Sequence, residues 1–236
     1  MPLIKIKKMK TRIIEYPLEK YNFTRIISNF LAVDELSEIK AESVIENSSG
    51  NKDFSLYKNM EQTQAYKRLY EKLNSEEGQE FYETFNNFIF NVIRPQYDEP
   101  IYYQEKPTHR ILFKNSEGVS RFHRDSDYGH NEAEINYFIP QTLAFETNTL
   151  WIESEKGKED YRAMNVSPGE MMRFKGVSLK HGAKKNETHK TRVSFDFRVI
   201  PFSKWPENVT DTSKWTEKDK QSNHLYKNAH QFKLCK

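Results

Sequence analysis

Cysteine, glycine and proline are scarce in this sequence of 236 residues, and each scarcity excludes a class of protein. A single cysteine, Cys235, rules out a disulfide framework within the chain and a zinc site made of cysteine ligands. Eight glycines and nine prolines are too few for a collagen-like repeat or a low-complexity chain. They also argue against a glycine-rich phosphate-binding loop.

Long apolar runs and a marked excess of one charge are absent as well. No segment approaches the roughly 20 apolar residues of a membrane helix, and residues 1–8 carry lysines without an apolar stretch of signal-peptide length. The 37 Lys and Arg residues nearly balance the 34 Asp and Glu residues, whereas surfaces that bind nucleic acids usually carry a strong basic excess. We therefore expect a cytoplasmic protein with neither a membrane nor a nucleic acid as partner. The sequence predicts no particular oligomeric state.

Aromatic residues, by contrast, are abundant. The 16 Phe, 13 Tyr and 3 Trp residues can build the core of a single domain over residues 1–236. Residues 1–107 are predicted to be its mainly helical support, because apolar residues at three- and four-residue spacings favour one helix around 66–73 and a second around 81–92. Asn74 and Glu77 between them have the spacing of a capping box, and Pro95 is expected to end the second helix.

Residues 108–201 have a different pattern, in which short β-rich runs are separated by turn formers. This pattern is typical of an antiparallel barrel or sandwich. The predicted strands are 110–113, 134–139, 148–152, 170–174 and 192–200. The last strand alternates strictly between an apolar face and a polar face, and the polar residues are Arg192, Ser194, Asp196 and Arg198. Its polar face therefore either faces water or lines a polar cavity.

Residues 202–236 are predicted to form a C-terminal extension. Trp205, Trp215 and Tyr226 lie there among many charged residues. The segment is expected either to cover the domain as a flap or to extend from it as a partly ordered arm.

The segment 121–130, Arg-Phe-His-Arg-Asp-Ser-Asp-Tyr-Gly-His, is the densest cluster of chemically active side chains. On an extended strand His123 and Asp125 point to the same face, because they are two residues apart. A further histidine, His181, follows 58 residues after His123. Two histidines and one carboxylate can occupy one face of an octahedral metal and leave three positions open, as in non-haem Fe(II) oxygenases. A co-substrate and O₂ can then bind at the open positions.

The co-substrate of such a site needs an anchor of its own. If the co-substrate is 2-oxoglutarate, a cation away from the metal must hold its distal carboxylate. Arg192 lies 11 residues after His181, and Ser194 lies on the same face of the alternating strand. A guanidinium fork and a hydroxyl suit a carboxylate well. Arg198, also on this face, is the second candidate for the anchor.

These motifs, in this order, resemble those of a known protein family. His-x-Asp, a distant His and Arg-x-Ser within residues 108–201 resemble the Fe(II)/2-oxoglutarate-dependent oxygenase superfamily. The residues around them, 122–130, 148–154, 181–182 and 191–198, resemble the branch that includes the StrG-like proteins of streptomycin biosynthesis. The resemblance implies an α+β fold with a double-stranded β-helix (jelly-roll) core and N-terminal bracing helices.

The same resemblance implies roles for particular residues. His123, Asp125 and His181 would bind Fe(II) and form the catalytic centre, and Arg192 with Ser194 would bind 2-oxoglutarate. The reaction implied is the oxidation, usually the hydroxylation, of a small molecule by O₂; the StrG-like branch points to a sugar or another secondary metabolite. Side chains near the predicted mouth are candidates for substrate contact or for ordinary barrel packing: Arg121, Tyr128, His130, Asn136 and Trp151.

Several alternatives stay open from the sequence alone. Asp127 shares the strand parity of Asp125 and could replace it as a ligand, and His130 could replace His181. The other histidines are expected at the surface: His109, His189, His224 and His230. The alternative function is a cupin-like module that binds a metal or a sugar without redox chemistry, and a third is an oxygenase that acts on a protein.

Overall fold

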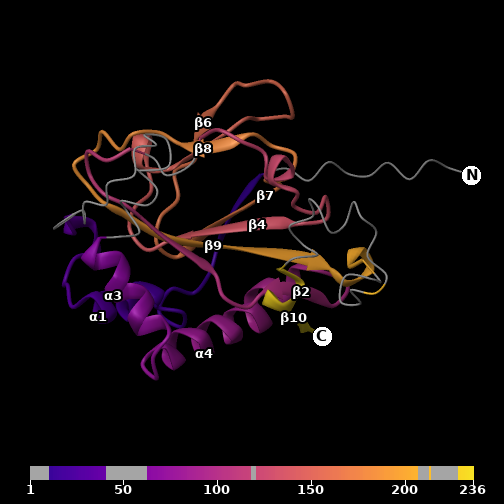
Figure 1. Ribbon diagram of the computed structural model, residues 1–236, viewed down its shortest axis with the longest axis horizontal. Coiled ribbons are helices and arrows are strands. Elements are labelled where there is room, and N and C mark those ends of the chain that lie inside the picture. Colours follow the sequence, from indigo (N-terminus) through magenta and orange to yellow (C-terminus); the bar gives the residue numbers. More distant parts are fainter. Residues whose placement is uncertain (1–10, 41–62, 118–120, 207–212, 214–227) are drawn as a thin grey trace, which may run out of the picture.

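The computed structural model describes residues 11–40, 63–117, 121–206, 213 and 228–236. Residues 1–8, considered above for a signal sequence, lie outside the described residues, as do Trp215, His224 and Tyr226. The described chain is arranged in three layers (Figure 1): a layer of helices, a large antiparallel sheet, and a small antiparallel sheet on the opposite side. No helix in these ranges is both long enough and apolar enough to cross a membrane.

The large sheet has seven strands and is centred on the ten-residue strand β9 (Arg192–Pro201). One side of β9 pairs with β4 (Ile135–Pro140), and the other pairs with β3 (Thr108–Leu112) and then with β2 (Ile101–Gln104). The remaining strands are β7 (Glu170–Phe174) beside β4, β1 (Arg12–Glu15) beside β7, and β10 (Phe232–Cys235) beside β2. All of these pairs are antiparallel.

The small sheet lies above the large one in Figure 1 and has the strand order β6-β5-β8. Its strands are β6 (Arg162–Ala163), β5 (Leu150–Ile152) and β8 (His181–Ala183), paired antiparallel. The predicted mixed α and antiparallel β composition is therefore confirmed. Three strands of the large sheet, β1, β2 and β10, come from outside residues 108–201, and each has only four residues.

The helices cover one face of the large sheet because their apolar stripes meet the apolar face of β9. In the described part of the chain these helices are α1 (Phe23–Leu31), α3 (Gln64–Leu73) and α4 (Gly78–Phe88). Phe81 and Phe85 of α4 are fully buried, and their rings lie edge-on to Phe195 and Phe197 of β9 at centroid distances of 5.6 and 5.1 Å. The apolar residues of β9 thus face this aromatic core, which leaves the polar residues on the side of the small sheet.

The helix ends differ from the sequence prediction. The hydroxyl of Thr63 accepts a hydrogen bond from the Tyr66 N–H and begins α3. Asn74 follows the last residue of α3, and Glu77 makes no side-chain capping bond to α4, so the predicted capping box is absent. The α-helix of the second segment ends at Phe88, and helical turns follow it: a π-helical turn, 89–93, and a 3₁₀ turn, 94–96, which ends one residue beyond Pro95. Proline is tolerated there because it occupies the first turn of the 3₁₀ segment.

One histidine expected at the surface is buried. His189 and His230 are exposed, but His109 on β3 is only 1% exposed and packs among Tyr70, Phe81 and Phe195. Strand parity explains the difference, since β3 lies against β9 and His109 is opposite Phe195 in the register. The C-terminal extension also packs in part: the Trp205 ring stacks on Tyr102 of β2 at 3.9 Å.

Candidate metal centre

A pair of backbone hydrogen bonds places the two predicted histidine ligands side by side. His123 and His181 exchange N–H···O bonds of 2.9 Å in an isolated antiparallel bridge at the end of β8. Residues opposed in this way project their side chains to the same face, and the two imidazole centroids are 4.7 Å apart. Gly182 allows the close approach, because a β carbon there would lie 3.0 Å from the Cα atom of Phe122.

Asp125 reaches the same point by a turn and not by a strand. The chain leaves the bridge after His123 and forms a short 3₁₀ helix over Asp125–Tyr128, and the Asp125 N–H donates to the Gly176 carbonyl at 3.0 Å. The expectation that His123 and Asp125 share one face of an extended strand is therefore wrong. The carboxylate is nevertheless directed inward, and Asp125 is only 2% exposed.

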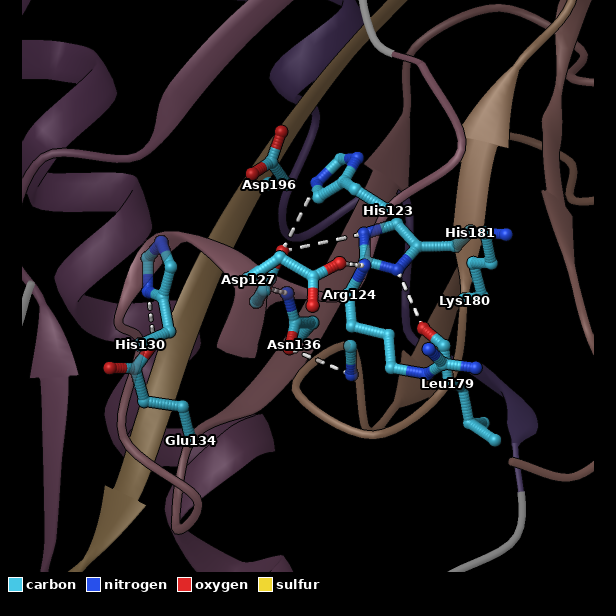
Figure 2. Close-up of polar contacts among 12 residues, drawn as sticks. His123, Arg124, Asp127, His130, Glu134, Asn136, Leu179, Lys180, His181 and Asp196 are labelled. Atoms are coloured by element: carbon cyan, nitrogen blue, oxygen red, sulfur yellow. Dashed lines mark hydrogen bonds and ion pairs between the residues drawn. The ribbon is translucent and has the colours of Figure 1, made fainter. Parts of the chain in front are cut away.

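The three side chains converge on one point, and Figure 2 shows the imidazoles of His123 and His181 next to each other. The Oδ1 atom of Asp125 lies 3.4 Å from Nε2 of His123 and 3.5 Å from Nε2 of His181. Two donor atoms that share a metal ion, each about 2.1 Å from it, are at most about 4.2 Å apart. Both Asp125 distances are below this limit, and ligand atoms of the three residues all lie within 4.8 Å of one another, so the group could hold a metal ion after small adjustments.

The hydrogen bonds of the imidazoles fix the form that a metal requires. Nδ1 of His123 lies 2.7 Å from the Arg121 carbonyl, and Nδ1 of His181 lies 2.9 Å from the Leu179 carbonyl. A carbonyl only accepts, so Nδ1 is assigned the proton in both rings, and in the neutral ring Nε2 carries the lone pair. Two nitrogen lone pairs and one carboxylate oxygen then face one another. This donor set fits a divalent transition-metal ion.

The electrostatics of Asp125 and His181 favour this donor set. Burial raises the pKa of Asp125, but the His123 hydrogen bond and the positive charge of Arg198 outweigh it and hold that pKa well below its usual value. Burial lowers the pKa of His181, which favours its neutral form. Burial also acts to lower the pKa of His123, but hydrogen bonds to Asp125 and to the Arg121 carbonyl outweigh it and raise that pKa.

The alternative ligands lie elsewhere. Asp127 is exposed, and its carboxylate accepts the Arg124 backbone N–H at 2.8 Å, closing the turn that carries Asp125. Nδ1 of His130 lies 2.7 Å from the buried carboxylate of Glu134, a pair visible in Figure 2. The structure thus brings Asp125 and His181 to His123 and gives Asp127 and His130 other partners.

A cavity between the two sheets connects the three residues with the predicted anchor. Its cavity volume is about 60 Å³, and the total space between its atoms, which includes open solvent, is about 540 Å³. Its lining comes mainly from the polar face of β9 and from facing positions on β3, β4, β7 and β8. The lining residues are Arg110, His123, Asp125, Asn136, Phe138, Leu150, Phe174, His181, Ala183, Arg192, Asp196 and Arg198. The polar face of β9 therefore lines a cavity and does not face bulk water.

Arg192 in this cavity is a buried cation with few partners. It is 1% exposed, its Nη1 donates to the hydroxyl of Ser194 at 3.0 Å, and its Nε has no hydrogen-bond partner among the described residues. Burial and the neighbouring charge of Arg110 lower the pKa of Arg192 to about 10. A buried charge without a counter-ion is unfavourable, so this guanidinium suits an anionic ligand that enters the cavity.

The residues predicted to lie near the mouth of the cavity each make different contacts. Arg121 is exposed, and Tyr128 is 63% exposed with its ring 5.1 Å from that of His123. Trp151 donates from Nε1 to the Glu146 carbonyl, and the Lys184 ammonium lies 3.3 Å from its ring centroid. Asn136, by contrast, lines the cavity and donates from Nδ2 to Oδ2 of Asp125 at 2.7 Å.

Sequence reasoning missed one buried carboxylate close to this centre. Glu153 is 1% exposed and accepts hydrogen bonds from the Lys180 N–H at 2.6 Å and from Nη2 of Arg124 at 3.2 Å. It thereby ties the residue that precedes His181 to the residue between His123 and Asp125. No spacing rule could identify it, because its partners are 29 and 27 residues away.

Comparison with known proteins gives one match in sequence. No family model matches the chain. The streptomycin biosynthesis protein StrG of Streptomyces griseus is 40% identical to it over 110 residues, which are 47% of this chain and 52% of StrG. The chain thus spans about half the length of the curated relative it matches.

The solved structures to which the chain is similar are distant in sequence, and their TM-scores are below 0.5. EctD from S. alaskensis with bound Fe has a TM-score of 0.48 and 10% identity, over 83% of this chain and 74% of that chain. CytC3 with Fe(II) and alpha-ketoglutarate has a TM-score of 0.45 and 15% identity, over 88% and 80%. AviO1 from Streptomyces viridochromogenes has a TM-score of 0.44 and 13% identity, over 84% and 92%. In sequence, the chain is similar to StrG over about half of its length, as its motifs predict.

Proposed function

We propose that the chain is an Fe(II)- and 2-oxoglutarate-dependent dioxygenase that oxidises, and in its simplest reaction hydroxylates, a small molecule. One observation carries the proposal. A single cavity contains the converging acceptor atoms of His123, Asp125 and His181, together with the buried guanidinium of Arg192. The first feature suits a divalent metal, and the second suits a carboxylate.

The protein residues have distinct roles in this reaction. When bound, Fe(II) supplies the oxidation chemistry, in which O₂ converts a C–H bond to C–OH while 2-oxoglutarate is split to succinate and CO₂. His123, Asp125 and His181 hold the ion. Arg192 and Ser194 bind the distal carboxylate of 2-oxoglutarate and so orient the co-substrate. This charge-assisted hydrogen bonding is worth about 1.5–3 kcal/mol.

The rest of the cavity is assigned to the primary substrate. Leu150, Phe174 and Ala183 contribute apolar surface that excludes water, and the Arg110–Asp196 pair, with Nε to Oδ1 at 2.7 Å, contributes polar groups. A small molecule with both apolar and hydrogen-bonding surface fits this lining. The similarity to a streptomycin biosynthesis protein favours a sugar or another secondary metabolite as the substrate.

Tyr128, beside His123 and largely exposed, is proposed to contact substrate at the rim of the cavity. The exposed Arg121 and the half-buried Trp151 are also proposed to contact substrate at this rim.

The layered sheets also support a proposal about the fold. The antiparallel large and small sheets enclose the cavity from two sides, and the His123–His181 bridge joins the end of the small sheet to the metal centre. We infer that they are the two halves of a double-stranded β-helix within one domain over residues 1–236. The helices of residues 1–107 brace it, and residues 202–236 extend it.

Release of succinate from 2-oxoglutarate tests the proposed activity. The purified protein, incubated with Fe(II), O₂ and 2-oxoglutarate, is expected to release succinate slowly even without the primary substrate, because uncoupled turnover is common to this chemistry. A metal- or sugar-binding module without redox chemistry, the second candidate, would release none. That module is less favoured because it has no use for a buried arginine opposite the metal ligands.

The variant Arg192→Met should raise the 2-oxoglutarate concentration needed for half-maximal succinate release by about one to two orders of magnitude. The loss of roughly 1.5–3 kcal/mol of carboxylate binding sets this range. The matched control is Arg162→Met, which removes an exposed arginine from β6 and should leave the requirement unchanged. If Arg192→Met has the wild-type requirement, the anchor is a different cation of the cavity, such as Arg110 or Arg198.

A further inference from the structure

The two oxygens of the Asp125 carboxylate have different surroundings. Oδ1 faces the two imidazole Nε2 atoms at 3.4 and 3.5 Å. Oδ2 accepts a hydrogen bond from Nδ2 of Asn136 at 2.7 Å and lies 3.3 Å from Nη2 of Arg198. One oxygen is therefore directed at the metal position, and the other is occupied by protein donors.

Asn136 is held so that its NH₂ group faces Asp125. Its Oδ1 accepts the backbone N–H of Gly176 at 3.2 Å, which leaves Nδ2 for the carboxylate. Gly176 also allows the contact sterically, because a β carbon there would lie 2.8 Å from Nδ2 of Asn136. The amide is thus fixed by the neighbouring turn on one side and by the carboxylate on the other.

Arg198 is held by a second buried carboxylate. Asn136 and Arg198 are opposite each other in the register of β4 and β9, so their side chains lie side by side on the cavity face. Nε of Arg198 lies 3.4 Å from Oε2 of Glu134, which is fully buried. Glu134 is fixed in turn by His130, with Nδ1 to Oε2 at 2.7 Å, and by the Asn131 N–H at 3.0 Å.

A positive charge next to a metal-binding carboxylate is unexpected on electrostatic grounds. Arg198 lies 3.3 Å from the carboxylate of Asp125, so its charge opposes the binding of a divalent cation there. The presence of Arg198 is explained if it fixes the orientation of the Asp125 carboxylate. Partners of this kind around a metal ligand typically change metal affinity by about 10- to 100-fold.

On the basis of the proposed function, we propose that Asn136 and Arg198 are positioning residues for the metal centre. They bind Oδ2 of Asp125, so that the carboxylate offers a single oxygen, Oδ1, to the ion. The other coordination positions stay available for the co-substrate and O₂. Glu134 and His130 keep Arg198 in place. This assignment gives Asn136 and His130 a role behind the carboxylate, and not at the substrate.

Binding of Co(II) to the purified protein, measured by calorimetry and by the electronic spectrum of the bound ion, tests this proposal. Arg198→Met and Asn136→Leu should each weaken Co(II) binding by about 10- to 100-fold. Both should change the spectrum, because the freed carboxylate can offer both oxygens. Arg198→Lys should recover part of the affinity and of the spectrum, since a lysine can still donate to Oδ2. A purely structural role would not predict this rescue.

Arg110→Met is the matched control. It removes a positive charge from the same cavity, from a guanidinium that donates to Asp196 Oδ1 at 2.7 Å. Charge alone predicts that both arginine variants bind Co(II) more tightly than the wild type. The positioning proposal predicts weaker binding for Arg198→Met and not for Arg110→Met. If Arg198→Met fails to fold, as judged by circular dichroism, Asn136→Leu decides the question.

The outcomes separate this proposal from the proposed function. If the wild type binds Co(II) no more tightly than His123→Ala, the metal centre and the proposed function both fail. If the wild type binds Co(II) through His123 and the Asn136 and Arg198 variants match its affinity and spectrum, only the positioning proposal is overturned.

Discussion

Replacing His123 or Asp125 by alanine is expected to abolish Fe(II) binding and the Fe(II)-dependent release of succinate. Each substitution removes one of three acceptor atoms that converge within 4.8 Å, and two remaining ligands cannot hold the ion in place. Equilibrium dialysis under anaerobic conditions measures the bound iron, and the succinate assay measures turnover. Circular dichroism verifies that each variant is folded.

The neighbouring acid Asp127 provides the control for these variants. It is exposed and binds the Arg124 N–H, a contact that an asparagine can also make. Asp127→Asn should therefore bind iron within a few-fold of the wild type. Full activity in Asp125→Ala, or loss of iron in Asp127→Asn alone, would show that the carboxylate ligand has been assigned to the wrong residue.

Replacing His109 by leucine is expected to change how stability depends on pH. Burial lowers the pKa of His109 to about 3, from a reference value of 6.5, although the charge of Asp196 opposes this shift. As the pH falls from about 6.5 towards 3, the unfolded chain takes up a proton that the folded protein does not. The free energy of unfolding then decreases by about 1.4 kcal/mol per pH unit from this group. His109→Leu removes that contribution.

Urea unfolding at pH 7 and pH 5 measures the effect. The free energy of unfolding of His109→Leu minus that of the wild type should be about 2 kcal/mol larger at pH 5 than at pH 7. At pH 7 itself the change is small, because two ring nitrogens with no hydrogen-bond partner among the described residues are removed along with contacts to Phe81 and Phe195. The exposed His189→Leu should follow the wild-type pH dependence. A constant difference between His109→Leu and the wild type at both pH values would show that His109 takes up its proton at the same pH in the folded and the unfolded protein.

Much of the secondary structure can be predicted from this sequence because its amphipathic periods are strong. The alternation over residues 192–200 predicts the central strand, and the phenylalanine spacing of residues 81–88 predicts α4. The short strands β1, β2 and β10 have four residues each, too few to show a period. Their pairing depends on tertiary contacts that no local pattern encodes.

The candidate ligands can be predicted, but the geometry that unites them cannot. The spacing of His123, Asp125 and His181 makes them candidates, but Asp127 has the same parity, and only the family resemblance favours Asp125 over it. In the structure the turn-closing contact of Asp127 sets it apart. Asp125 lies on a 3₁₀ turn, and its N–H donates a hydrogen bond to the carbonyl of Gly176, which is 51 residues away in the sequence. His109 was expected at the surface because histidine is polar, whereas its depth depends on the strand opposite it.

The division into layers has a consequence for how this kind of protein can diversify. β9 carries both Arg192 and Arg198, and its other face is locked into the aromatic core beneath the helices. Leu150 of β5 and Ala183 of β8 line the cavity from the small sheet. Both strands are short, and Arg162 on the paired strand β6 and Lys184 directly after β8 are exposed. Substitutions at Leu150 and Ala183 are expected to alter which molecule is accepted while leaving the proposed ligands His123, Asp125 and His181 and the proposed anchor Arg192 in place. Selectivity and reactivity can therefore evolve at different rates within one small protein.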